Sequence, residues 1–217
     1  PVERLHPSLH RALMGSDLPL RAEPDRDNPE WHRTDSLLRS GRWAQMGRVY
    51  ADRIGTRHLA PGLICAFQRY ASRVIQPPVV AWFADGCVLD MRHEQWWARI
   101  DPGARTTVVA SPGMDVCANY ADATQLAEAL HAHLDPLIGA VYSAGNVTLR
   151  AATGAAATAV ARAFGVVFRG VEEPRRPEVV TVARTVLATF ETPARSRAGL
   201  LPTVSLVQLD DPVALTF

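Results

Sequence analysis

The strongest constraint on the fold is a run of small residues in the second half of the chain. Most positions from Ala151 to Ala163 are Ala or Gly. Alanine is the best helix former, and a surface of Ala and Gly lets a neighbouring helix approach closely. The run therefore predicts a helix over residues 147–164 that packs tightly against another helix.

An apolar stripe just before this run predicts a partner helix over residues 124–142. Either Asp122 or Thr124 is expected to cap its first turn, because a short polar side chain accepts hydrogen bonds from the unpaired N–H groups there. Residues 143–146 would join the two helices into the central hairpin of the fold. The stripe consists of aliphatic side chains at the spacing of one helix face: Leu126, Leu130, Leu134, Leu137, Ile138 and Val141.

The same kind of spacing predicts helices over residues 3–14, 30–39, 43–54, 58–83 and 178–190. The segment 58–83 contains Pro77 and Pro78. Each proline removes a backbone donor and restricts the residue before it. We therefore expect this segment to break into two apolar helices.

Extended segments are predicted over residues 87–91, 95–100 and 106–110, with an Asp-Pro-Gly turn at 101–103. The adjacent Trp96 and Trp97 would face opposite sides of a strand, one in the core and one as a surface platform. A terminal hairpin is expected within residues 203–217. The predicted fold is α+β and mainly α, a helical domain with a small antiparallel β-sheet. An N-terminal helical segment, 1–40, and a domain over 41–217 are expected to form one folded unit.

Charge and composition exclude some classes of partner. The chain has 217 residues and a net charge of +1, which gives no electrostatic case for binding nucleic acid. The longest apolar run, 79–83, is too short to span a membrane. An odd number of widely spaced cysteines (Cys65, Cys87 and Cys117) indicates a reducing compartment, so we expect a cytoplasmic protein.

The residues themselves point to no single chemistry. The chain has no recognisable catalytic motif, and all 23 basic residues are Arg, which excludes Schiff-base chemistry on lysine. The candidate catalytic residues are His58, His93 and His131, which could also hold a haem or an iron ion, although most such histidines are ordinary surface or core residues. His131 and His133 would point about 200° apart on a helix, so they cannot share a metal, and no metal site is predicted.

The order of the predicted elements resembles a known family. A broken apolar helix pair over 59–83 leads into an aromatic strand over 95–100. A helix ending in Leu-Asp-Pro-Leu-Ile-Gly-Ala-Val at 134–141 follows, and then a Gly/Ala helix from Thr148. This order resembles the FhuF-like ferric-siderophore reductase family, whose domain is also similar to the C-terminal part of siderophore synthetases of the aerobactin type. The resemblance covers residues 42–164.

The chain departs from this family at two places. Family members usually begin the last of these helices with Trp-x-Asn, where this chain reads Arg150-Ala-Ala152. The family's reductases hold a [2Fe–2S] cluster with an adjacent cysteine pair and a later Cys-x-x-Cys, whereas this chain has no cysteine after Cys117. Thiolates hold such clusters. We therefore expect no [2Fe–2S] cluster and no ordinary relay for one-electron reduction.

Three functional hypotheses follow from the resemblance. The first is a cluster-less FhuF-like protein that handles a siderophore, a ferric siderophore or a related carboxylate or hydroxamate metabolite. The second is an enzyme of siderophore or secondary-metabolite biosynthesis, oxidoreductase-related or haem- or metal-dependent, with a base among the three candidate histidines. The third is a structural or interaction protein. The oligomeric state stays open.

The first hypothesis makes the most specific assignment of binding residues. Arginine pairs bidentately with planar anions, and an exposed aromatic ring offers a platform for a ligand. A pocket lined by arginines would favour this hypothesis, and a coloured protein would favour the second. The expected ligand-binding residues are Arg48, Arg53, Arg57, Trp97 and Arg150.

Overall fold

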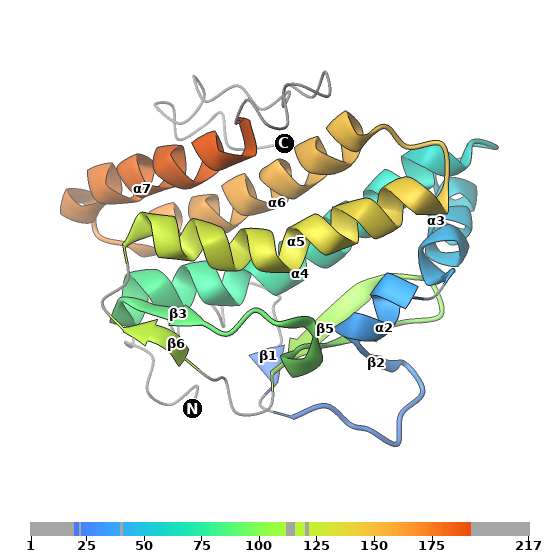
Figure 1. Ribbon diagram of the computed structural model, residues 1–217, viewed down its shortest axis with the longest axis horizontal. Helices are drawn as coiled ribbons and strands as arrows, with labels where there is room; N and C mark the ends of the chain where they lie inside the picture. Colours follow the sequence, from blue (N-terminus) through green and yellow to red (C-terminus); the bar gives the residue numbers. More distant parts are fainter. Residues whose placement is uncertain (1–19, 22, 40, 112–115, 120–121, 192–217) are drawn as a thin grey trace.

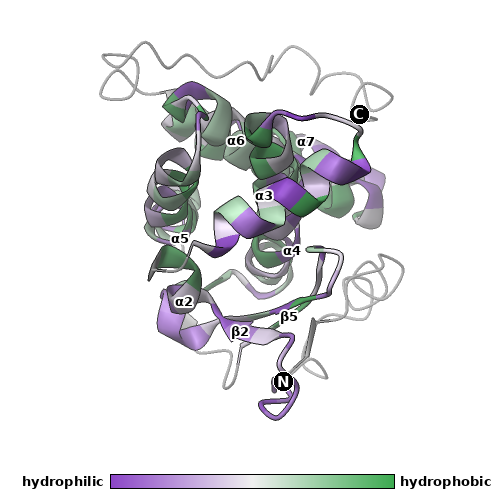
Figure 2. Cartoon of the chain, turned by 90° about the vertical axis from the view of Figure 1, so that its right-hand side faces the viewer, coloured by the Kyte–Doolittle hydropathy of each residue, from purple (hydrophilic) through white to green (hydrophobic). Residues whose placement is uncertain are grey.

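Helix α4 (Leu59–Asp85) runs through the centre of the fold and contacts helices α3, α5 and α6 and strands of both sheets. The computed structural model describes residues 20–21, 23–39, 41–111, 116–119 and 122–191. The long helices lie together on one side of the molecule, and two small sheets lie below them (Figure 1). Viewed from the side, the apolar segments are concentrated on these stacked helices (Figure 2).

The predicted break at Pro77 and Pro78 is wrong, because α4 continues through both residues. Each proline removes one helical hydrogen bond, which disfavours a helix locally. Every residue from Val74 to Ala81 is buried, however, so packing of the surrounding elements on this stretch outweighs the local penalty. The helix ends at Gly86, whose positive φ of 62° suits glycine.

The two helices predicted from the small-residue run and the stripe before it are confirmed. Helix α5 (Ala123–Ala144) starts at Asp122, whose side chain accepts from the backbone N–H groups of Thr124 and Gln125 in a capping box. Helix α6 (Leu149–Gly170) starts at Thr148. It packs on α4 more extensively than on α5, as its Ala/Gly surface permits.

The remaining helices are shorter and close the bundle. Helix α3 (Arg42–Arg53) crosses α4 so closely that a Cβ on Gly62 would collide with the carbonyl oxygen of Gly47. Helix α7 (Arg176–Ala188) packs on α6 and α5, between 3₁₀ turns at Glu173–Arg175 and Thr189–Glu191. Helix α2 (Thr34–Arg39) is six residues long and packs on α5.

The main sheet has the strand order β1–β5–β4–β2. Strand β4 (Trp97–Ile100) lies antiparallel to both β5 (Thr106–Ala110) and β2 (Trp31–Arg33), and β1 (Leu20–Arg21) lies parallel to β5. A second, two-stranded sheet pairs β3 (Cys87–Leu89) with β6 (Val116–Asn119). The fold is therefore α+β and mainly α, as expected.

Two details of this region differ from expectation. Residues 31–33 form a strand and not the start of a helix, because their backbone pairs with β4 and Trp31 is buried against Val108 and Ala110. A 3₁₀ turn, η2 (His93–Gln95), precedes β4. Trp96 is fully buried, as predicted for one of the two tryptophans, whereas Trp97 is half-buried and packs against the cluster of Trp31, Val108 and Ala110. The helix expected at 3–14 and the hairpin at 203–217 lie outside the described residues.

One described helix, α6, is long and apolar enough to cross a membrane by length and composition. However, 72% of its most apolar window is buried inside the fold. This burial is typical of the core helix of a soluble protein, so α6 gives no clear indication of a membrane span.

Candidate functional site

A groove lined by four arginines lies between α4 and α6. We call it the arginine groove, and it has a volume of about 550 Å³. This volume falls within the range of small-molecule sites in proteins. Its lining consists of polar residues of α4 and mostly small or basic residues of α6: Arg69, Ser72, Arg73, Gln76, Ala161, Arg162, Ala163, Gly165, Val166 and Arg169.

Helical spacing explains why these residues meet. On α4 the lining residues are 69, 72, 73 and 76, and on α6 they include 162, 165, 166 and 169, so each set forms a stripe with intervals of three and four. The two helices pack against each other, which brings the stripes to the same groove. The small residues Ala161, Ala163 and Gly165 leave room between the long arginine side chains.

The groove is strongly basic. None of its lining residues is Asp or Glu. Arg162 and Arg169 are exposed at its edge, whereas Arg69 and Ser72 are half-buried. The Nε atom of Arg69 and the hydroxyl of Ser72 are buried without a hydrogen-bond partner among the described residues. Since buried polar groups are normally hydrogen-bonded, these two atoms call for an acceptor from a ligand or from water.

A buried polar network holds another face of α4 against α5 and η2. The Tyr70 hydroxyl and the His133 Nε2 atom lie 2.9 Å apart, and the His133 Nδ1 atom lies 2.7 Å from the carbonyl oxygen of Met91. A carbonyl oxygen only accepts, so Nδ1 carries the proton and Nε2 accepts from Tyr70. Both side chains are fully buried. Tyr70 therefore faces the core, whereas Arg69, one residue earlier and about 100° around the helix, lines the groove.

Burial keeps His133 and Tyr70 neutral. Loss of hydration, followed by the neighbouring His93, lowers the pKa of His133 to about 3. Burial also raises the pKa of Tyr70 above its ordinary value. The His93 ring stacks on His133, with centroids 4.5 Å apart, and its Nε2 donates to the His133 carbonyl oxygen across 2.9 Å. The network thus links α4, α5 and η2 as a structural element of the core.

The three candidate catalytic histidines lie on different elements. His58 is exposed at the N-cap of α4, and His93 is buried in η2. His131 is half-buried on α5, where its ring nitrogens contact Asp135 and Thr189. None of these histidines lines the arginine groove.

The binding residues predicted from the sequence also lie outside the arginine groove. Arg48 and Arg53 are exposed on α3, and Arg53 donates to the Gly103 carbonyl oxygen. Arg57 precedes α4, and Arg150 lies in the first turn of α6; both are exposed. The Trp97 ring is half-buried on β4, with the Arg26 guanidinium 5.7 Å from its centroid.

The sequence analysis did not predict the groove arginines as binding residues, although their spacing gives a signal. Arg162 and Arg169 are the charged residues of an otherwise small and apolar stretch, two helical turns apart. Arg69 and Arg73 interrupt an apolar helix at an interval of four. Each pair predicts a polar stripe on its own helix, but nothing in the sequence states that the stripes face each other.

The described His, Cys, Asp and Glu side chains do not gather into a site for an iron–sulfur cluster or for a metal ion held by three protein ligands. Within the described part of the chain, no group of three or more His, Cys, Asp or Glu side chains could hold a metal ion. Cys65 is half-buried on α4, and the Cys87 thiol lies 3.8 Å from the Ala81 carbonyl oxygen. The side chain of Cys117 lies outside the described set.

Comparison of the chain with protein-family models, with curated proteins and with solved structures found no match. The arginine groove, and not a relative, therefore supplies the argument for function.

Proposed function

We propose that this chain is a cluster-less FhuF-like protein of the cytoplasm that binds an anionic small molecule, a siderophore or a related carboxylate or hydroxamate metabolite, in the arginine groove. The observation that carries this proposal is the groove itself, in which four arginines and no carboxylate line one cavity. The resemblance in element order names the ligand class, and the groove supplies a place for it.

The charge of the groove selects for a polyanion. Arg162 and Arg169 lie exposed at its edge, where they can meet an incoming ligand, and Arg69 and Arg73 lie deeper. Clefts lined by one sign of charge concentrate oppositely charged ligands. Each guanidinium presents a planar fork of donors that matches a carboxylate or a hydroxamate. Siderophores of the aerobactin type carry both groups, and their ferric complexes remain anionic.

The buried donors add specificity to this attraction. The Arg69 Nε atom and the Ser72 hydroxyl have no partner among the described residues, so a ligand oxygen that reaches them would satisfy two buried groups at once. A ligand without an acceptor at that position would leave them unsatisfied. This contrast favours an oxygen-rich ligand over an apolar one of equal size.

Isothermal titration calorimetry with one free siderophore and two ferric siderophores tests the proposal. Aerobactin and ferric aerobactin are anionic, whereas ferrioxamine is a cationic trihydroxamate complex of similar chemistry. We expect the two anionic compounds to bind and ferrioxamine not to bind. Failure of both anionic compounds to bind, or equal binding of ferrioxamine, would contradict the proposal.

Charge-removing variants locate the binding. The double variant R162Q/R169Q should weaken the binding of the anionic compounds by at least about tenfold, since hydrogen bonds to charged groups contribute about 1.5–3 kcal/mol each. The exposed Arg33 on β2 offers a matched control, because it pairs with Asp35 away from the groove. R33Q should bind as the unmodified chain does. Equal affinity of R162Q/R169Q and R33Q would place the ligand elsewhere.

A further inference from the structure

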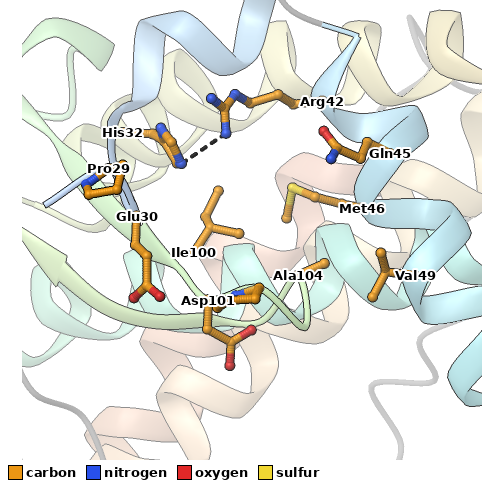
Figure 3. Close-up of a pocket in the computed structure, with 11 residues that line it drawn as sticks. Pro29, Glu30, His32, Arg42, Gln45, Met46, Val49, Ile100, Asp101 and Ala104 are labelled. Atoms are coloured by element: carbon orange, nitrogen blue, oxygen red, sulfur yellow. Dashed lines mark hydrogen bonds between the residues drawn. The ribbon is translucent and has the colours of Figure 1, made fainter.

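A second pocket lies between α3, β2 and the turn after β4. We call it the β2–α3 pocket, and it has a volume of about 230 Å³. Figure 3 shows His32 and Arg42 on one side of this pocket and Glu30 and Asp101 on the other. Its remaining lining residues are mainly apolar: Pro29, Gln45, Met46, Val49, Ile100, Pro102 and Ala104.

The floor of the pocket is an apolar surface. Met46 and Ile100 are almost fully buried, with 4% and 8% of their surface exposed, and Ala104 is 5% exposed. The pocket is smaller than the 300–1,000 Å³ that is typical of sites for drug-sized ligands. A ligand for it therefore has a compact apolar body, of the size of one ring or one branched chain.

His32 orients Arg42 without neutralising it. The Arg42 Nη1 atom lies 2.8 Å from the His32 Nε2 atom, and a guanidinium only donates, so His32 accepts this hydrogen bond as a neutral ring (Figure 3). Burial, and then the charge of Arg42, lowers the pKa of His32. The contact fixes the position of the guanidinium while its positive charge and its other donors remain.

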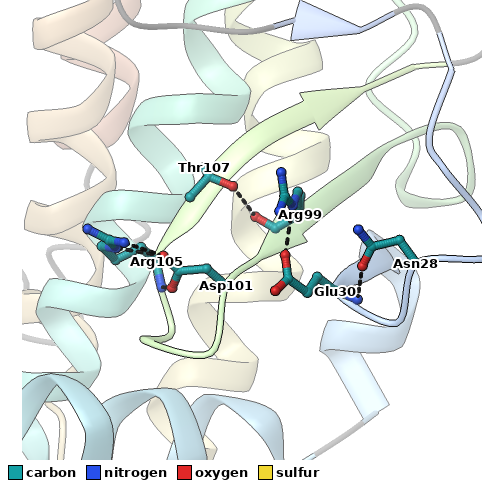
Figure 4. A network of polar contacts seen from close by, with 6 residues as sticks. All are labelled: Asn28, Glu30, Arg99, Asp101, Arg105 and Thr107. Carbon is teal, nitrogen blue, oxygen red and sulfur yellow. Dashed lines mark hydrogen bonds and ion pairs between the residues drawn. The ribbon is translucent and has the colours of Figure 1, made fainter.

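Both carboxylates of the pocket are already engaged by other arginines (Figure 4). The Arg99 Nε atom lies 2.7 Å from Glu30 Oε2. Asp101 accepts from the backbone and the guanidinium of Arg105, with its Oδ2 atom 2.6 Å from Arg105 Nη2. Among the charged residues that line the pocket, Arg42 is therefore the one without an ion pair to a carboxylate of the described residues.

The position of Arg42 in its helix also favours an anionic ligand. Arg42 is the first residue of α3, and the first turn contains no acidic side chain. A cation at a helix N-terminus opposes the helix dipole, whereas an anion there is stabilised by it. An anion bound to Arg42 would relieve this unfavourable arrangement.

We propose that the β2–α3 pocket binds a small monocarboxylate with an apolar body, whose carboxylate pairs with the Arg42 guanidinium and whose apolar part covers Met46 and Ile100. The planar fork of an arginine matches a carboxylate in two parallel hydrogen bonds. This site is separate from the arginine groove. Its single cation and apolar floor select a monoanion, whereas the groove selects a polyanion.

Ligand-observed ¹⁹F NMR with two matched probes tests this proposal. The probe 4-fluorobenzoate carries the carboxylate, and 4-fluorobenzamide has nearly the same shape without the charge. We expect the full chain to bind the benzoate at least about tenfold more tightly than the benzamide, because the charge-assisted pair is lost in the amide. Equal affinity for the two probes, or no binding of the benzoate, would overturn the proposal.

Three variants assign the binding to Arg42. R42Q should weaken benzoate binding about tenfold, and R42K should weaken it less, because lysine keeps the charge and loses the planar fork. R33Q changes the neighbouring residue of His32 on β2 and should bind the benzoate as before. Circular dichroism checks that each variant is folded. If R42Q binds the benzoate like the unmodified chain, the carboxylate lies elsewhere and the proposal is overturned.

The arginine groove is tested in the same experiment. R162Q/R169Q should keep its affinity for 4-fluorobenzoate, whatever its effect on aerobactin. Loss of benzoate binding in R162Q/R169Q but not in R42Q would assign the benzoate to the groove and overturn the inference about Arg42. The two proposals can therefore fail independently.

Discussion

The Tyr70 hydroxyl donates a hydrogen bond to the Nε2 atom of His133 across 2.9 Å. This bond joins α4 to α5 in the core, where both side chains are fully buried. Tyr70 thus belongs to the buried face of α4. The basic stripe on the same helix then faces the arginine groove. A core hydrogen bond and a surface site are thus two consequences of one helix orientation.

Removing the Tyr70 hydroxyl should destabilise the fold. In Y70F the buried Nε2 atom of His133 loses its donor, and an unsatisfied buried acceptor costs about 1–3 kcal/mol. Urea unfolding measures the change in the free energy of unfolding. Tyr142 is the matched control, since its side chain is 54% exposed and Y142F should change stability by less than about 0.5 kcal/mol. Equal effects of the two variants would refute a role for the buried contact.

His133 should make the stability fall in acid. Its folded pKa of about 3 lies below its ordinary value, so between about pH 6.5 and pH 3 the unfolded chain binds a proton that the folded chain does not. Stability is then full above about pH 6.5 and decreases by about 1.4 kcal/mol per pH unit below it. We expect the difference in unfolding free energy between the unmodified chain and H133Q to shrink over this range. A difference that stays constant with pH would contradict a neutral buried His133.

The crossing of α3 and α4 should depend on Gly62. A Cβ at this position would meet the backbone of Gly47 and Ala51, which cannot move aside as a flexible side chain can. G62A should therefore lower the free energy of unfolding by about 1–3 kcal/mol. Gly139 of α5 is the control, because a Cβ there meets nothing within 4 Å. G139A should be neutral or stabilising by about 0.5–1 kcal/mol, since Ala favours a helix more than Gly does.

Two arginines of α6 distinguish the arginine groove from the binding residues inferred from the sequence. Arg162 lines the groove, whereas Arg150 is exposed in the first turn of the same helix. We expect R162Q to weaken aerobactin binding about tenfold and R150Q to weaken it by less than about twofold. Titration calorimetry measures both. A larger effect at Arg150 would favour the sequence-based assignment over the groove.

The purified protein should lack the absorption bands of a [2Fe–2S] cluster. The described cysteine side chains, Cys65 and Cys87, lie on different elements, and the chain has no cysteine after Cys117. An absorption spectrum with iron analysis checks this expectation. Charge-transfer bands or a Soret band with stoichiometric iron would support the alternative of a cofactor-dependent enzyme, and His58, His93 and His131 would then be the first residues to substitute.

Local pattern predicted most of the helices and two strands of the main sheet. The stripe before the small-residue run located α5, and the strands β4 and β5 lie within the segments predicted to be extended. Prediction from local pattern failed where contacts with segments distant in sequence determine the secondary structure. Residues 31–33 form a strand because β4 lies beside them, and α4 stays helical through Pro77 and Pro78 because its neighbours bury that stretch.

The sequence by itself determined a mainly helical α+β chain and a small-residue helix suited to close packing. Only the tertiary structure brought together the residues of the two proposed sites. Arg69 and Arg162 lie on different helices far apart in sequence, as do His32 and Arg42 on a strand and a helix. Helical spacing determines which residues share one face of a helix. Which faces meet depends on the packing of the whole core.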